Sequence, residues 1–171
     1  MNLTLSTPRL ALRLWQSHLI MIVFGFIVFA TNDFTKTHPV ITGLATAFLL
    51  MIYFILCYNE ANRCGKNDVN QGKDGGPWKG LFAGLLAALP GAVLYGAGFF
   101  FTMPQAWYRL YMVVFEGLLS FTGEGWLMKL AILLPLPLIS GIAYGSGRKG
   151  RNLVETVQKG LTKLVYQEKN S

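Results

Sequence analysis

The stretch that decides the fold runs from Gly80 to Gly98 and reads GLFAGLLAALPGAVLYGAG. It contains no charged residue, one proline and five glycines. About 20 apolar residues suffice for a helix to cross the hydrocarbon core of a bilayer. Small residues let membrane helices approach one another closely. The stretch therefore predicts a transmembrane helix that packs tightly against a neighbour.

The rest of the chain repeats this pattern. Uncharged runs of similar length occupy residues 14–32, 37–59 and 130–147. Hydrophobic residues make up 53% of the 171-residue chain and charged residues only 13%, about half the roughly 25% of ordinary soluble domains. We expect an all-α polytopic membrane protein with one transmembrane domain, residues 1–147. Its four spans are expected at about 14–32, 39–58, 78–103 and 126–147, with an uncleaved first span and a flexible loop at 59–77.

The distribution of cations predicts the orientation. Lys and Arg number two before residue 14, four in 59–79 and six after 147, against one in 31–38 and one in 104–125. Cytoplasmic loops carry an excess of these residues, so four crossings of the cell membrane place both termini in the cytoplasm. The net charge of +7 does not indicate nucleic acid binding, because the cations flank the apolar runs instead of forming a basic face.

Two segments outside the spans are amphipathic. In 104–125, Arg109, Glu116 and Glu124 interrupt an apolar face and aromatic residues flank it, which favours an external interfacial or re-entrant helix over a fifth crossing. In the tail, 148–171, apolar residues recur on one helical face and basic residues occupy the remaining positions, as in helices that lie on anionic inner-leaflet lipid.

Small residues recur at intervals of four in two spans. One interpretation is that they pack the bundle's own helices together, and the other is that one ridge receives a helix of another membrane protein or of a second copy. Proline lacks a backbone N–H and disturbs a helix interior. The predicted packing positions are Gly80, Gly84, Ala88, Ala92, Gly96, Gly141 and Gly145, and the predicted helix breaks are Pro90, Pro135 and Pro137.

Chemical motifs are sparse. Cys57 and Cys64 lack the paired spacing of a metal site and are expected to be free thiols. His18 and His38 are expected on opposite sides of the bilayer, so neither catalytic residues, nor a metal, nor a cofactor is expected. The outer side gathers polar residues that either line a shallow ligand or partner site or form a solvated rim: Arg109, Glu116, Glu124, Asp33, Lys36 and His38.

Three segments carry a resemblance. PWKGLFAGLLAALP at 77–90, YRL at 108–110 and LPLISGIAYGSGRKG at 136–150 resemble a group of small four-span bacterial integral membrane proteins with no assigned activity. The resemblance covers the latter half of the chain. It implies an architecture and no chemistry.

Three functions are compatible with this sequence. We favour a non-enzymatic accessory or scaffold subunit that packs against partner transmembrane helices through its Gly/Ala ridges. The alternative is a small transporter or channel-forming subunit, which would require a water-accessible cavity between the third and fourth spans. The third is a membrane-embedded lipid-modifying enzyme, which would require clustered acids, histidines or metal ligands.

Overall fold

The structure is a computed structural model that describes residues 6–30, 38–73, 76, 78–115, 118–119 and 125–151. Within these ranges every regular element is a helix, which confirms the all-α class. Four helical stretches are long and apolar enough to cross a membrane, and this indicates a multi-pass membrane protein. They are Thr7–Phe29, Val40–Asn70, Lys79–Ala97 and Leu127–Arg148.

The helices follow one another with short connections. The elements are α1 (Ser6–Ala30), α3 (Pro39–Asn70), α4 (Lys79–Ala97), α5 (Thr102–Tyr111), the 3-10 helix η1 (Val113–Phe115), α7 (Trp126–Ala131) and α8 (Pro135–Arg148). Of the predicted tail, 148–171, only residues 148–151 are described, and the rest lies outside the described ranges.

The second helix corrects the sequence expectation. A flexible loop was expected from residue 59, but α3 has 32 residues and continues to Asn70. Gly65 lies against the backbone of α8, where a Cβ would overlap the Tyr144 carbonyl, and Ala61 is fully buried. Packing against α8 therefore keeps a segment of weak helix formers helical, since tertiary contacts override local propensity.

The third span is shorter than expected, and the fourth is interrupted just before Pro135, one of the predicted break positions. The span expected to reach residue 103 ends at Ala97, and a new helix, α5, begins at Thr102. The fourth span divides at residues 132–134, and Pro135 is the first residue of α8, because proline is tolerated at the first turn of a helix. Pro90 lies inside α4, which continues through it. There the Tyr111 hydroxyl donates a hydrogen bond to the Ala87 carbonyl at 3.3 Å.

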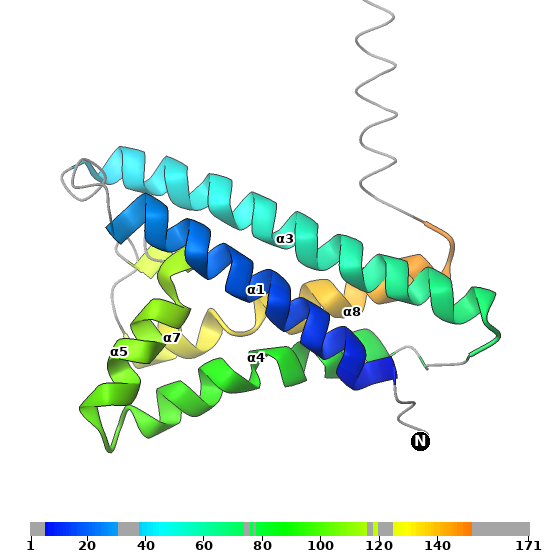
Figure 1. The fold of residues 1–171 in the computed structure, drawn as a ribbon. Coiled ribbons are helices and arrows are strands. Elements are labelled where there is room, and N and C mark those ends of the chain that lie inside the picture. The colour runs from blue at the N-terminus through cyan, green and yellow to red at the C-terminus, as the bar shows by residue number, and fades with distance from the viewer. Residues whose placement is uncertain are drawn as a thin grey trace, which may run out of the picture.

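The helices run alternately along one bundle (Figure 1). The start of α1, the end of α3, the start of α4 and the end of α8 lie at one end. There the Asn62 side chain donates to the Arg151 carbonyl at 2.8 Å. The turn between α4 and α5 lies at the opposite end (Figure 1). Because α8 ends at the same end of the bundle at which α1 begins, the chain runs along the bundle an even number of times.

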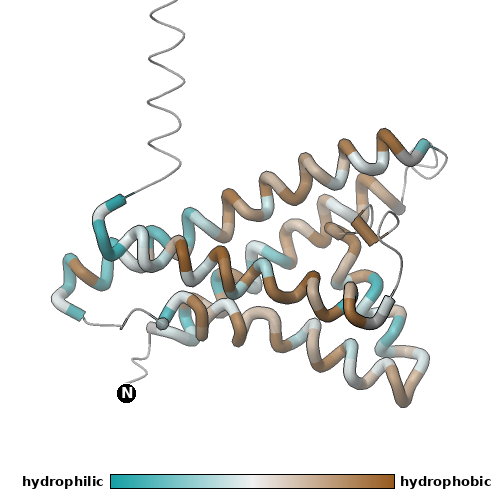
Figure 2. Tube along the Cα trace, turned by 180° about the vertical axis from the view of Figure 1, so that it is seen from behind, coloured by the Kyte–Doolittle hydropathy of each residue, from teal (hydrophilic) through white to brown (hydrophobic). Residues whose placement is uncertain are grey.

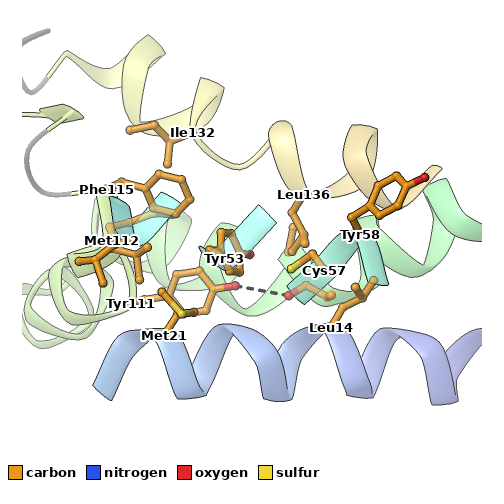
Figure 3. Close-up of a cluster of buried hydrophobic side chains, with 14 of the residues drawn as sticks. Leu14, Met21, Tyr53, Cys57, Tyr58, Tyr111, Met112, Phe115, Ile132 and Leu136 are labelled. Atoms are coloured by element: carbon orange, nitrogen blue, oxygen red, sulfur yellow. Dashed lines mark hydrogen bonds between the residues drawn. The ribbon is translucent and has the colours of Figure 1, made fainter. Parts of the chain in front are cut away.

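Apolar residues dominate the middle of the helices, and hydrophilic residues gather toward the ends, above all at the end that holds the N-terminus (Figure 2). The core lies between α1, α3, α4 and α8 and is closed by α5 and the residues that follow it. In Figure 3, Tyr53 and Cys57 lie between Leu14 and Met21 on one side and Leu136 on the other.

Candidate functional site

The small-residue ridge of α4 divides into two parts. Gly80 and Gly84 face α8, where a Cβ on Gly84 would overlap the Ser140 hydroxyl and lie 2.5 Å from the Pro137 Cα. Ser140 donates a hydrogen bond to the Gly80 carbonyl at 2.9 Å. The close approach is possible only without side chains. These glycines therefore pack the chain's own helices together.

The other part of the ridge has room around it. A Cβ on Gly96 would meet no described atom within 4 Å. On α8, a Cβ on Gly145 would likewise meet none, and one on Gly141 would make an ordinary contact at 3.4 Å with Leu81. Ala92 is exposed, and Ala88 is 7% exposed. Ala92 and Gly96 thus border a surface that other described helices leave open, whereas Ala88 lies at its buried edge.

An apolar groove follows this surface between α4 and the broken fourth span. Its volume is about 640 Å³. Both walls come from apolar side chains, and Ala88 and Ala92 are the smallest on the α4 side. The lining consists of Phe82, Leu85, Leu86, Ala88, Leu89, Ala92, Leu127, Leu130, Ala131, Leu133, Leu134 and Pro137.

A smaller polar cleft lies beyond the groove, at the junction of α4, α5 and α7. It measures about 220 Å³ and contains the predicted site residue Arg109 together with Lys129. The Tyr108 hydroxyl donates to the Lys129 carbonyl at 2.8 Å. Burial raises the pKa of the Tyr108 phenol well above its usual value, so the hydroxyl remains a donor. The remaining lining residues are Leu94, Tyr95, Gly98, Phe99 and Gln105.

Of the predicted outer polar group, the structure describes only Arg109 and His38. Arg109 lines the cleft, whereas His38 is exposed at the start of α3 and does not line it. Asp33, Lys36, Glu116 and Glu124 lie outside the described residues. Sequence reasoning left Lys129 out of this group, although its position one turn inside the fourth span was the available signal.

A buried charged cluster at the opposite end was missed by sequence reasoning. The Lys79 ammonium group forms an ion pair with Asp68, and the two side chains are only 1% and 7% exposed. The Tyr144 hydroxyl donates to the same carboxylate at 2.6 Å. Asp68 and Lys79 were assigned to the flexible loop and its edge, so nothing in the spacing suggested burial. The cluster ties α3, α4 and α8 together.

A second buried polar cluster contains His18, which is 2% exposed. Its Nε2 lies 3.1 Å from the Tyr111 carbonyl, and its Nδ1 lies 3.2 Å from the Tyr53 hydroxyl. Because a carbonyl can only accept, Nε2 carries a proton and donates to Tyr111, while Nδ1 is hydrogen-bonded to the Tyr53 hydroxyl. Both ring nitrogens are thus paired, and the cluster joins α1 to α3 and α5.

Metal-ligating and redox groups form no further site within the described ranges. No three His, Cys, Asp or Glu side chains there are grouped so that they could hold a metal ion. Cys57 is buried and Cys64 half-buried, both as free thiols. The groove and the cleft described above are hollows that a partner or ligand could enter.

No family model, curated protein or solved structure matches the chain. The resemblance to small four-span bacterial membrane proteins therefore stays a prediction. Function must be inferred from the geometry of the molecule.

Proposed function

We propose that the protein is a non-enzymatic accessory or scaffold subunit of the cell membrane that binds a transmembrane helix of another membrane protein. The observation that carries this proposal is the apolar groove between α4 and the fourth span. In lipid, helices associate through close packing at small residues, since apolar side chains gain little by leaving lipid tails. Ala88, Ala92 and Gly96 supply such positions on one face of α4.

The two parts of the ridge support this assignment differently. Gly80 and Gly84 are used within the chain, where their close approach holds α4 against α8. Gly96 borders open space, and Ala92 is exposed in the groove. Small residues at the same four-residue spacing therefore form an internal helix contact in the first half of α4 and face outward in the second half. A partner helix that carries large apolar side chains fits this surface.

The groove does not favour transport. A polar pathway between the third and fourth spans needs hydrogen-bonding or charged groups along it, but every residue that lines the groove is apolar. The buried polar clusters around Asp68 and His18 bond within the chain. These features favour a docking role over a transporter or channel-forming subunit.

The orientation and the segments outside the spans belong to the same proposal. Both termini are cytoplasmic because the cation-rich segments lie at one end. The helix α5, with exposed Trp107 and Met103, lies in the external interface. The basic tail rests on anionic inner-leaflet lipid.

The proposal is tested by site-specific photo-crosslinking in intact membranes. A photoreactive residue at Ala92, in the groove, should give one adduct of defined mass that contains a different polypeptide. The matched position Ala47 is also exposed, but on α3, and should give none. An Ala92→Leu substitution should reduce adducts from a probe at Leu89, whereas Ala47→Leu should not. Crosslinks to lipid alone at both positions would contradict the proposal.

Gly96→Leu is a second probe of the same surface. Gly84→Leu cannot serve, because it would disrupt the contact of α4 with α8 within the chain. Gly96 has no described atom near its Cβ position, so Gly96→Leu should leave the protein folded and still weaken recovery of the partner in mild detergent. Unchanged recovery would exclude this part of α4 from the interface.

A further inference from the structure

Two tyrosines of α5 bond to the backbones of both walls of the apolar groove. The Tyr108 hydroxyl donates to the Lys129 carbonyl of α7 at 2.8 Å, and the Tyr111 hydroxyl donates to the Ala87 carbonyl of α4 at 3.3 Å. A direct chain neighbour of each acceptor residue lines the groove. Neither tyrosine is among the described residues that line it. The two side chains therefore act on the groove indirectly, through its walls.

The spacing of the two tyrosines suits this double contact, because residues three apart lie on the same side of an α-helix. The Tyr111 ring also reaches the middle of α4. A Cβ on Gly91 would lie 2.5 Å from Tyr111 Cε1 and 2.9 Å from Leu133 Cδ2, and Leu133 lines the groove. Tyr111 thus lies where α4 and the fourth span come together.

The helix α4 is most easily deformed at the same point. Pro90 has no N–H to donate to the Leu86 carbonyl one turn earlier, and sharp bends in helices occur mostly at such sites. The two positions at which Tyr111 meets α4, Ala87 and Gly91, lie on either side of Pro90 in the chain. Tyr111 therefore supports α4 where its own hydrogen bonds support it least.

The inner end of α5 is anchored in the core. From Tyr111 to Phe115 no residue is more than 9% exposed. The Tyr111 carbonyl accepts a hydrogen bond at 3.1 Å from His18, which lies at the centre of α1. A Cβ on Gly25 of α1 would lie 3.0 Å from Val113 Cγ1. The chain after α5 is therefore packed directly against α1 and gives α5 a fixed base.

The outer face of α5 is exposed. Met103 and Trp107 are 74% and 60% exposed, and the Gln105 amide donates to the Gly98 carbonyl at 2.7 Å, which holds α5 to the end of α4. The helix thus extends from an exposed surface to a buried anchor and contacts both groove walls between them. Packed side chains and hydrogen bonds of this kind are the contacts through which distant sites are coupled.

We propose that α5 is a strut that sets the width of the groove, with Tyr108 and Tyr111 as positioning residues for the docking of a partner helix. The identity of the occupant rests on the proposed function, whereas the spacing of the walls is a property of this chain alone. Walls held at one separation lose less affinity to ordering when a helix binds. Because the outer face of α5 is exposed, contacts made on the external side regulate docking within the membrane.

The test measures the spacing of the walls in the full-length protein. Spin labels are attached at Leu89→Cys of α4 and Leu127→Cys of α7, which are both exposed and both line the groove. The native thiols are removed by Cys57→Ala and Cys64→Ala. Electron paramagnetic resonance then reports the distribution of distances between the two labels across the groove.

The informative variant is Tyr108→Phe/Tyr111→Phe, which keeps both rings and removes both hydrogen bonds to the walls. Its distance distribution should broaden or shift by about 1–2 Å, the scale of helix shifts at packed interfaces. Tyr58→Phe is the matched control, because it removes a phenol hydrogen bond of 3.3 Å to Ser146 near the other end of the bundle. It should leave the distribution unchanged. An unchanged distribution in the double variant would overturn the proposal.

Photo-crosslinking separates this inference from the proposed function. The yield of the partner adduct from a probe at Ala92 should fall about fivefold in Tyr108→Phe/Tyr111→Phe, which corresponds to the net contribution of about one hydrogen bond. It should not change in Tyr58→Phe. If the distances change but the wild type gives no adduct with another polypeptide, the proposed function fails and the strut stands. If the distances change and the adduct yield does not, the strut does not control docking and this inference is wrong.

Discussion

Replacement of Lys79 by Met tests whether the buried ion pair holds α3, α4 and α8 together. The Asp68 carboxylate is paired with Lys79 and accepts a hydrogen bond from Tyr144, and the Asp68 and Lys79 side chains are 7% and 1% exposed. Loss of one partner leaves the other charge buried and uncompensated, which costs about 3–5 kcal/mol. For a chain of this size that corresponds to a fall in Tm of roughly 10 °C.

The assay is thermal unfolding in detergent, followed by circular dichroism. Lys73→Met is the matched control, because Lys73 is exposed and should change Tm by less than about 2 °C. Asp68→Asn/Lys79→Met should destabilise by less than the sum of the two single variants, since the charges are removed together. If the Lys79→Met variant has the same Tm as the Lys73→Met control, the ion pair contributes nothing to stability and the reasoning is refuted.

Four further substitutions probe the packing of the bundle by the same thermal measurement. Gly84→Ala should destabilise by at least about 1 kcal/mol because its Cβ overlaps backbone and side-chain atoms of α8. Gly145→Ala, where a Cβ would meet no described atom, should be neutral or stabilise by about 0.5–1 kcal/mol. Equal effects of Gly84→Ala and Gly145→Ala on Tm would contradict the conclusion that Gly84 faces a helix contact and Gly145 does not. Tyr53→Phe should cost about 0.5–1.5 kcal/mol by removing the hydrogen bond to His18, and a stabilised variant would argue against that bond. Asn62→Ala should cost about 1–3 kcal/mol, because Asn62 bonds two carbonyls, on α8 and just beyond it, and an unchanged Tm would show these bonds to be dispensable.

The sequence predicts the parts of the fold that follow from the length of its hydrophobic runs. Four apolar runs predict four helices long enough to cross a membrane, and the structure has them. The distribution of cations predicts that the α3–α4 connection and the end of α8 share one end of the bundle, as they do in Figure 1. Both features depend on composition over many residues, which a single sequence displays directly.

The remainder depends on contacts between distant residues. The polar stretch after residue 59 favours a loop locally, but Ala61 and Gly65 pack against α8 and keep it helical. For the same reason the ion pair of Asp68 and Lys79 could not be foreseen, since two charged residues in a polar segment ordinarily face solvent. The four-residue spacing of the ridge identified packing positions but not which of them face inward.

The central claim is that the chain crosses the bilayer four times and therefore returns to the side from which it starts. Single cysteines at Lys73, Arg151 and Phe100, in a chain with Cys57→Ala and Cys64→Ala, can be labelled in intact cells with a membrane-impermeant maleimide. The account predicts that the Phe100→Cys variant is labelled from outside, while Lys73→Cys and Arg151→Cys are labelled only after the membrane is opened. Labelling of the Lys73 and Arg151 positions from opposite sides would contradict it.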